Sequence, residues 1–141
     1  MATHASRRTD LTGKHFENHC YDLLDKAGYN VEEQVNLGLR PTGGAHNVDL
    51  VIIEDEVEDA QVLISLKYKD VAGTAEEKIP YEQISLQHAC ETYGYKKAYI
   101  LLAGPGWKHD QTYIDGGLNK WLNTPDVEVI DYDKFESLFS L

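Results

Sequence analysis

The sequence predicts an α/β protein in which helices flank a central mixed sheet. Short β-branched runs at 48–53, 61–68 and 97–102 have the length and composition of strands. Helical patterns precede the first of these runs and separate the later ones, and this order favours a sheet with both antiparallel and parallel neighbours. Helices are therefore expected on both faces of the sheet.

The first part of the chain is predicted to form a helix and a strand. Thr12 is the expected N-cap of the helix, and Gly28 is its expected C-terminal stop. Residues 31–37 alternate apolar and polar side chains, as a half-buried strand does, with some slippage in the alternation. Residues 38–46 contain Pro and Gly and are expected to form a turn or flexible loop.

The two central runs, 48–53 and 61–68, are predicted to pair as an antiparallel hairpin. The acidic cluster within 54–59 is expected to form the tip of this hairpin. Alternate residues of a strand share a face. One face of the second strand is therefore expected to carry Leu63, Ser65 and Lys67, and the other Val62, Ile64 and Leu66.

The rest of the chain is predicted to alternate helices and strands. After a polar loop at 70–79, Pro80 suits the first turn of a helix that Gly94 ends. The apolar side of this helix is expected to consist of Ile84, Leu86 and Ala89. The strand at 97–102 leads into a turn at 103–106. A C-terminal extension is expected to consist of a helix near 111–122, a strand at 127–130 and a helix at 133–140.

Length and composition are those of one globular domain without a membrane span. The chain has 141 residues, which suffices for a single core. Residues 1–10 are expected to form a flexible arm, and residues 11–141 a single domain. No apolar run approaches the ~20 residues of a membrane helix, and the N-terminus has no apolar signal-peptide core. Cys20 and Cys90 show neither disulfide nor zinc spacing, which favours an intracellular, cytoplasmic location.

The charge balance runs against nucleic-acid binding, because proteins that bind nucleic acids are usually basic. The net charge is -11. Five of the acids lie in the cluster within 54–59, and without them the remainder carries about -6. Basic residues recur elsewhere, so a locally basic cleft stays open as an interpretation. These residues are Arg7, Arg8, Lys14, Arg40, Lys67, Lys69, Lys78, Lys96 and Lys97.

Asp49 and Lys67 are the residues that most strongly indicate chemistry. Asp49 stands in an otherwise apolar strand, where an unpaired carboxylate is unfavourable. Lys67 lies near the end of the neighbouring strand, so the predicted hairpin brings the two side chains toward each other. An Asp–Lys pair at this place indicates either an active site or a structural ion pair at the sheet edge.

The order of the elements and these residues resemble the PD-(D/E)XK nuclease superfamily. The matching motif is Asn-Val-Asp at 47–49, then the hairpin, then Ser-Leu-Lys at 65–67. Upstream, the segment 13–17 resembles the first helix of resolvase-like members, whose glutamate, here Glu17, faces the metal site. The resemblance covers about residues 12–104. It implies a restriction-endonuclease-like αβββαβ core with a central mixed sheet flanked by helices.

The motif departs from the superfamily at Ser65, where the resemblance implies Asp or Glu. Serine cannot supply the anionic oxygen that a hard cation prefers. Some restriction enzymes of the superfamily carry serine here and take the acid from the following helix. Glu82, in the first turn of the predicted helix, fits this migrated position. Glu77 is the alternative acid and Gln83 a further candidate, and the sequence leaves the choice between them open.

The resemblance implies a Mg²⁺-dependent DNA endonuclease of the restriction-like or homing type, with Mn²⁺ as a substitute, that hydrolyses phosphodiester bonds. Asp49, Glu82 and the backbone carbonyl of Leu66 are the implied metal ligands. Glu17 is implied to hold a second metal ion or its waters, and Lys67 to contact the scissile phosphate or the attacking water. A chain this small is expected to act on DNA as a homodimer or higher homo-oligomer, because cutting two strands needs two sites.

Three other functions stay open. A structure-specific junction resolvase or repair nuclease belongs to the same class of enzymes. A catalytically inactive nuclease-fold module that binds nucleic acid or a partner protein is favoured by Ser65 and by the excess of acidic residues. An acidic protein that mimics DNA is the third, but it gives no role to Lys67 within a strand.

Overall fold

The computed structural model describes residues 13–53, 61–69, 75–107 and 110–141. The expectations for the N-terminal arm, the cap Thr12, the acidic hairpin tip and the first part of the loop 70–79 lie outside these residues. The elements, in chain order, are α1 (Gly13–Lys26), β1 (Asn30–Leu39), β2 (Ala45–Ile53), β3 (Gln61–Tyr68), the 3-10 helix η2 (Ala75–Glu77), α2 (Lys78–Tyr93), β4 (Lys97–Ala103), α3 (Asp110–Ile114), β5 (Val127–Ile130) and α4 (Tyr132–Phe139). No helix in the described part of the chain is long and apolar enough to cross a membrane.

The five strands form one mixed sheet in the order β1-β2-β3-β4-β5. β2 is antiparallel to both β1 and β3, whereas β3, β4 and β5 run parallel to one another. Each parallel step is made through a helix, α2 or α3, because parallel neighbours need a long crossover connection. The predicted mixed sheet is therefore confirmed. The register of β3 against β4 places Lys67 beside Leu102.

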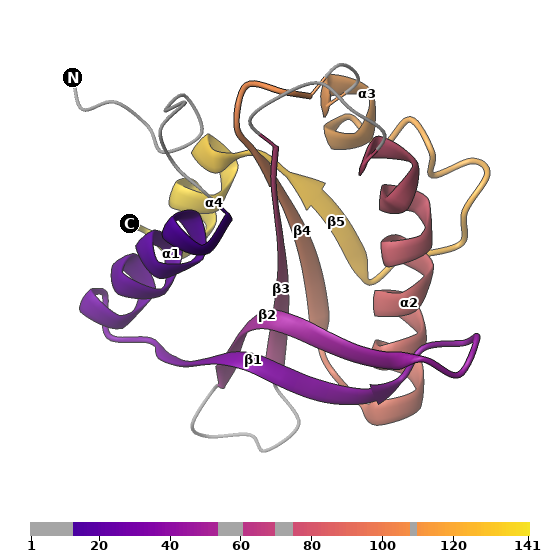
Figure 1. Ribbon diagram of the computed structural model, residues 1–141, viewed down its shortest axis with the longest axis horizontal. Helices are drawn as coiled ribbons and strands as arrows, with labels where there is room; N and C mark the ends of the chain where they lie inside the picture. The colour runs from indigo at the N-terminus through magenta and orange to yellow at the C-terminus, as the bar shows by residue number, and fades with distance from the viewer. Residues whose placement is uncertain (1–12, 54–60, 70–74, 108–109) are drawn as a thin grey trace.

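Helices cover both faces of the sheet, as predicted (Figure 1). α1 and α4 pack against one face in a cluster that includes Phe16, Phe135 and Ile64. α2 packs against the other face in a cluster that includes Leu86 and Leu63. Because Leu63 and Ile64 belong to different clusters, the predicted alternation of faces along β3 is confirmed.

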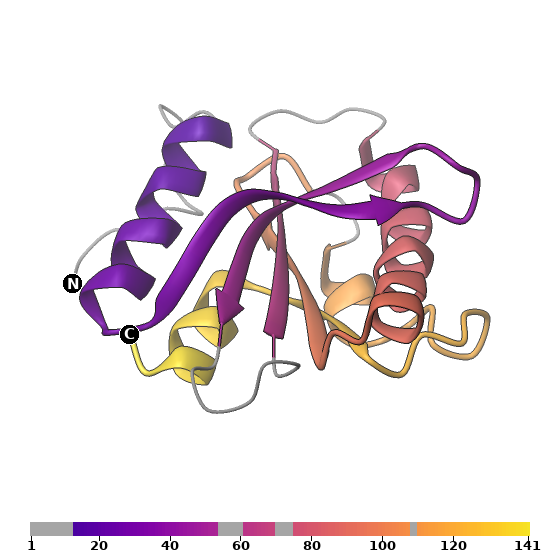
Figure 2. The ribbon, with the colours of Figure 1, turned by 90° about the horizontal axis from the view of Figure 1, so that it is seen from below.

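β1 and β2 change the face that they bury partway along their length. β1 runs from the side of α1 to the side of α2 (Figure 2). Its Val31 packs in the cluster with α1, whereas its Leu37 packs in the cluster with α2. In β2, Leu50 packs in the cluster with α1 and Val48 in the cluster with α2. Residues two apart in a strand normally share a face, so the buried face changes between them. The reversal occurs where Gln34 adopts a left-handed backbone with φ of 53°, and this bend explains the slipped alternation in the sequence.

α2 matches the prediction at its ends but not along its apolar side. It begins at Lys78, which puts Pro80 in the first turn, and Gly94 ends it with φ of 82°. Ile84 is 41% exposed, so its predicted place on the buried side is wrong. Residues three or four apart share a helix face. The buried apolar side consists of Ile79, Leu86, Ala89 and Cys90.

The helix expected near 111–122 is also shorter than predicted. α3 ends at Ile114, and turns follow it. Gly116 has φ of 77°, which does not continue a helix. A Cβ at Gly117 would lie 2.9 Å from the carbonyl oxygen of Thr112. The glycine pair therefore ends the helix despite the helical pattern that continues beyond it.

Gly104 closes the turn after β4 against the end of β3. Its backbone has φ of 91°, and a Cβ there would lie 2.4 Å from the carbonyl oxygen of Lys69. The same carbonyl accepts a hydrogen bond from the Gly106 N–H at 2.8 Å. The turn thus holds the backbone of Lys69 in close contact.

We expect Gly104→Ala to lower the free energy of unfolding by about 3 kcal/mol, because backbone strain and the contact with Lys69 add together. Gly43→Ala is the matched control. Gly43 has φ of 98° but no neighbouring atom within 4 Å, so strain alone is expected to remove about 1 kcal/mol. Urea unfolding of both variants measures the difference, and equal losses would contradict a role for the close approach.

Candidate active site

One pocket of about 260 Å³ gathers most of the residues that the sequence singles out. Asp49 enters it from β2, Glu17 from α1, and Leu66 and Lys67 from β3. The other residues that line it are Gly13, Tyr68, Lys69, Lys78 and Trp107. Glu82 is the exception, since it is not among the described residues that line this pocket.

Hydrogen bonds connect the two carboxylates of the pocket. The Leu66 N–H donates to Asp49 Oδ2 at 2.6 Å. The side-chain amide of Gln34 donates through Nε2 to Glu17 Oε1 at 2.8 Å and to Asp49 Oδ1 at 3.3 Å. Lys14 Nζ forms an ion pair with Glu17 Oε2 at 3.1 Å. Asp49 and Glu17 are therefore tied together through one amide group.

The carboxylate of Asp49 is held in an unfavourable electrostatic environment. Burial raises the pKa of Asp49 above its usual value. The Leu66 N–H and Lys67 favour the charged form and oppose the rise, whereas the negative charge of Glu17 adds to it. Such a desolvated carboxylate is suited to bind a cation, because a cation compensates the buried negative charge.

We expect Asp49→Asn to keep the free energy of unfolding at neutral pH in EDTA close to that of the wild type, because removal of the buried charge offsets the loss of one hydrogen-bond acceptor. A carboxyl whose folded pKa is raised above the unfolded value destabilises the fold once it is ionised, and asparagine removes that charge. Asp22→Asn, at an exposed position of α1, is the matched control and should leave stability unchanged. A clear loss of stability in Asp49→Asn, measured by urea unfolding, would contradict this account of Asp49.

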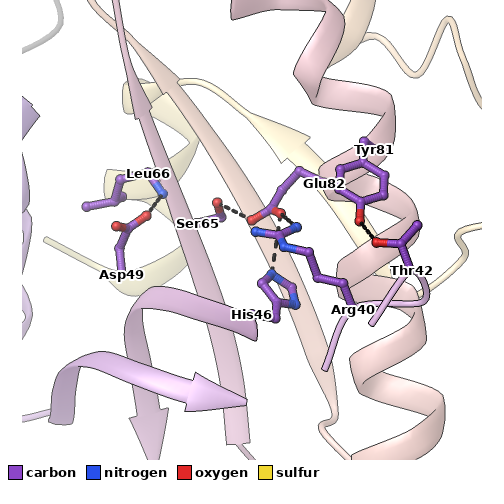
Figure 3. A network of polar contacts seen from close by, with 8 residues as sticks. All are labelled: Arg40, Thr42, His46, Asp49, Ser65, Leu66, Tyr81 and Glu82. Carbon is purple, nitrogen blue, oxygen red and sulfur yellow. Dashed lines mark hydrogen bonds and ion pairs between the residues drawn. The ribbon is translucent and has the colours of Figure 1, made fainter. Parts of the chain in front are cut away.

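Glu82 lies beside Ser65, and the turn between β1 and β2 contacts its carboxylate (Figure 3). The Ser65 hydroxyl donates to Glu82 Oε2 at 2.8 Å. Arg40 Nη1 donates to Glu82 Oε1 at 2.9 Å, and His46 Nε2 lies 3.3 Å from the same oxygen. His46 favours the charged form of Glu82, although the geometry of this contact falls short of a hydrogen bond within the described structure. The acid therefore stands next to the serine, as the resemblance implies, with Arg40 as its partner.

The neighbours of Glu82 hold it in the charged form. Burial by itself would raise the pKa of this carboxyl, but nearby donors and cations outweigh burial and lower the pKa to about 2. In order of their effect, they are His46, Lys67, Ser65 and Arg40. A carboxyl whose folded pKa lies below its unfolded value of 4.5 stabilises the fold above pH 4.5, and this stabilisation is lost as the pH falls toward 2.

We expect the protein to lose about 3 kcal/mol of stability between about pH 5 and pH 2 through the protonation of Glu82. Glu82→Gln lacks this titration, so its free energy of unfolding should fall less over the same range. Protonation of Asp49 changes the free energy of unfolding in the opposite direction. Both proteins contain Asp49, so this change cancels when they are compared. Urea unfolding at a series of acidic pH values measures the effect. The same acid dependence in both proteins would contradict it.

The pocket also carries three lysines, Lys67, Lys69 and Lys78. Lys69 forms an ion pair with Glu76 at 3.2 Å, and its Nζ lies 5.1 Å from the centroid of the Trp107 ring. Three of the basic residues that the sequence singled out thus line one pocket, although the net charge of the chain is -11. The two carboxylates line the same pocket.

The alternative candidates for the missing acid lie elsewhere. Glu77 is exposed on η2. Gln83 is buried and lines a different pocket, together with Tyr113 and Val129. Of the three candidates, Glu82 is the one that contacts Ser65.

Gln34 and His46 were not predicted from the sequence as part of this region, and Arg40 was singled out only as one of the basic residues of a possible cleft. The Arg40 N–H donates to the Gly44 carbonyl at 2.7 Å, which closes the turn between β1 and β2. A hairpin brings residues on either side of its turn together, so the basic pair at 40 and 46 was a usable signal. For Gln34 the sequence carries no such signal, because a polar side chain at an exposed strand position is ordinary.

The pocket offers oxygen ligands that suit a hard divalent cation. Mg²⁺ binds carboxylate oxygens, such as those of Asp49 and Glu17, and main-chain carbonyl oxygens. The side-chain NH₂ group of Gln34 donates to both carboxylates, so the space between them is favourable for positive charge. Among the described residues, no three His, Cys, Asp or Glu side chains gather closely enough to hold a metal ion by themselves. Two carboxylates and the main chain of Leu66 could therefore hold a cation only together with water or other side chains.

The chain is similar to known proteins at the level of family and fold. A family model described as a PD-(D/E)XK nuclease superfamily domain matches residues 5–133. No curated protein matches the chain. Among solved structures, it is similar to a protein of unknown function, AF1548, with 13% sequence identity and a TM-score of 0.51, over 84% of this chain and 57% of that one.

A second solved structure is the small subunit (R.BspD6I2) of the heterodimeric restriction endonuclease R.BspD6I. The identity is 23% and the TM-score 0.47, with 89% of this chain and 67% of that subunit covered. The chain thus spans little more than half the length of the first structure and about two thirds of the second. The likeness to AF1548 shows a shared fold.

Proposed function

The chain belongs to the PD-(D/E)XK nuclease superfamily, and on this premise we propose that it is a Mg²⁺-dependent endonuclease that hydrolyses phosphodiester bonds in DNA. One observation carries the proposal. The pocket that holds the carboxylates of Asp49 and Glu17 is also lined by Lys67 and two further lysines. Carboxylates bind a divalent cation, and both the cation and the lysines attract a phosphodiester.

The proposed cation ligands are Asp49, Glu17 and the backbone carbonyl of Leu66. A bound divalent cation supplies Lewis acidity and lowers the pKa of a bound water. The Leu66 N–H fixes Asp49 Oδ2, and Lys14 contacts Glu17 Oε2. These contacts hold one oxygen of each carboxylate in place before a cation binds. Mn²⁺ is expected to substitute for Mg²⁺.

Lys67 is proposed as the catalytic residue that contacts the scissile phosphate or the attacking water. Its ammonium group favours hydroxide over water and stabilises the negative charge that develops on the phosphate oxygens. Lys78 is exposed at the first residue of α2, and we propose that it binds a neighbouring phosphate. Phosphate contacts of this kind position DNA without reading its sequence.

Glu82 is proposed as the acid that replaces the one missing at Ser65. Its support is the hydrogen bond from the Ser65 hydroxyl and the favourable interaction with Lys67. Its Oε1 accepts from Arg40, which belongs to the turn between β1 and β2. We expect Glu82 to contribute to the cation site once Arg40 exchanges this contact for another anion, such as a DNA phosphate.

The proposed enzyme acts as a homodimer, because cleavage of two strands needs two sites. The same pocket suits a restriction-type enzyme and a junction-resolving or repair nuclease, since both hydrolyse the same bond. The pairing of Glu82 with Arg40 favours a second candidate, a catalytically inactive module that binds DNA through its lysines.

Cleavage of supercoiled plasmid and of a four-way junction, each with Mg²⁺, Mn²⁺ or EDTA, tests the proposal. Cutting of plasmid that depends on the metal supports the endonuclease, and a strong preference for the junction supports the resolvase. Binding of either DNA without cutting under any condition supports the inactive module. The absence of both binding and cutting would contradict all three forms of the proposal.

A further inference from the structure

The side-chain amide of Gln34 lies between the two carboxylates of the proposed cation site. Its Nε2 donates to Glu17 Oε1 at 2.8 Å and to Asp49 Oδ1 at 3.3 Å. These two acceptors come from different elements, α1 and β2, and each carries negative charge. A single NH₂ group therefore reduces their repulsion at the place where a cation would do so.

The backbone at Gln34 is unusual for a residue inside a strand. Among the described residues other than glycine, only Gln34 and Ser140 have a positive φ. Ser140 is the C-cap of α4, a position where this conformation is common. Gln34 instead lies in the middle of β1, opposite the stretch of β2 that carries Asp49. The bend in β1 thus brings the glutamine side chain to the two carboxylates.

The carboxylates of Asp49 and Glu17 are also too few to surround a cation, so further oxygen ligands are needed. No three acidic, histidine or cysteine side chains of the described residues form a metal-binding group, and Glu82 Oε1 is engaged by Arg40. Hard cations accept amide carbonyl oxygens as ligands alongside carboxylates. The terminal torsion of glutamine is broad and nearly two-fold, so a half-turn of the amide exchanges the positions of Nε2 and Oε1.

We propose that Gln34 is a further metal ligand of the site. Without a cation, its NH₂ group holds Asp49 and Glu17 together. When a cation binds, the amide turns and its Oε1 coordinates the ion. This inference rests on the proposed function, since it assumes that the two carboxylates bind the cation.

Binding of Mn²⁺, measured by electron paramagnetic resonance in the absence of DNA, tests the assignment. We expect Gln34→Ala to weaken binding about tenfold, because one ligand is lost. Gln34→Gly should weaken it equally, although glycine accepts the backbone conformation without strain. Gln34→Glu, which keeps the shape and adds an anionic oxygen, should bind Mn²⁺ at least as tightly as the wild type.

Gln111→Ala is the matched control. Gln111 also donates its amide to a carboxylate, Asp115, at 2.8 Å, but on α3 and outside the pocket. It should bind Mn²⁺ as the wild type does. Thermal unfolding in EDTA of each variant shows whether the protein is folded at the temperature of the measurement.

Two contrary results are distinguishable. If Gln34→Ala and Gln34→Gly bind Mn²⁺ as tightly as the wild type or more tightly, while Asp49→Asn loses binding, then the amide only neutralises the carboxylates. That result overturns the assignment of Gln34 and leaves the proposed site intact. If the wild type does not bind Mn²⁺, or Asp49→Asn binds it equally, then the proposed site itself is wrong and the assignment of Gln34 fails with it.

Discussion

Replacing Lys67 with methionine is expected to lower the rate of DNA cleavage by about 10²–10³-fold while leaving Mn²⁺ binding close to that of the wild type. Methionine keeps much of the length of the side chain but removes the positive charge. The lysine lines the pocket beside Asp49 and favours the charged forms of both Asp49 and Glu82. Its loss should therefore remove the stabilisation of charge on the phosphate without removing a proposed metal ligand.

Single-turnover cleavage with saturating enzyme separates this effect from weaker DNA binding. Lys120→Met is the matched control, because it also removes one positive charge. Lys120 lies outside the pocket, near the exposed ring of Trp121. The control should cleave at the rate of the wild type. A Lys67→Met protein that cleaves as fast as Lys120→Met would contradict a catalytic role for this lysine.

Replacing Glu82 with alanine is expected to have the second-largest effect, on both activity and stability. Arg40 and His46 would face a buried space without their acidic partner. Breaking a buried ion pair on one side commonly costs about 3–5 kcal/mol. Cleavage should fall at least about 10²-fold, because the acid next to Ser65 is lost. Glu77→Ala, at an exposed position of η2, should change neither quantity.

Glu82→Gln separates the two effects of Glu82→Ala. The glutamine keeps the volume of the side chain and still accepts a hydrogen bond from Ser65 or Arg40, so the loss of stability should be smaller than in the alanine variant. Cleavage should still fall strongly, because the anionic oxygen is gone. Full activity of Glu82→Gln would contradict a role in cation binding. Glu82 would then have only a structural role, through its contact with Arg40 in the turn between β1 and β2.

Most of the fold was predictable because its elements follow local rules. The strand at 127–130 was predicted with the bounds that the structure shows, since a β-branched run is bounded by turn residues. The two inner strands pair as predicted because their apolar runs are short and adjacent in the chain. The prediction failed at Gly116–Gly117, where backbone conformation overrides a helical pattern, and at Ile84, where tertiary packing decides which helix face is buried.

The site was predictable only where a residue type conflicted with its surroundings. Asp49 stands out because an unpaired carboxylate in an apolar strand is unfavourable. Glu17 followed from the resemblance of the segment 13–17 to the first helix of resolvase-like members. Gln34 does not conflict with an exposed strand position, so nothing local marks its contact with both carboxylates. The contact of Arg40 with Glu82 depends on how a hairpin packs on a distant helix, which is information that single-sequence patterns do not contain.

The most direct test of the central claim is nicking of supercoiled plasmid by the wild type and by Asp49→Asn, with Mg²⁺ and with EDTA. The asparagine variant is the right comparison, because it keeps the shape of the side chain and is expected to be about as stable as the wild type, so unfolding does not explain its inactivity. We predict nicking by the wild type with Mg²⁺, none with EDTA, and none by Asp49→Asn with either. Equal nicking by the two proteins, or no nicking by the wild type with Mg²⁺, would contradict the claim that Asp49 lies at the centre of a metal-dependent nuclease site.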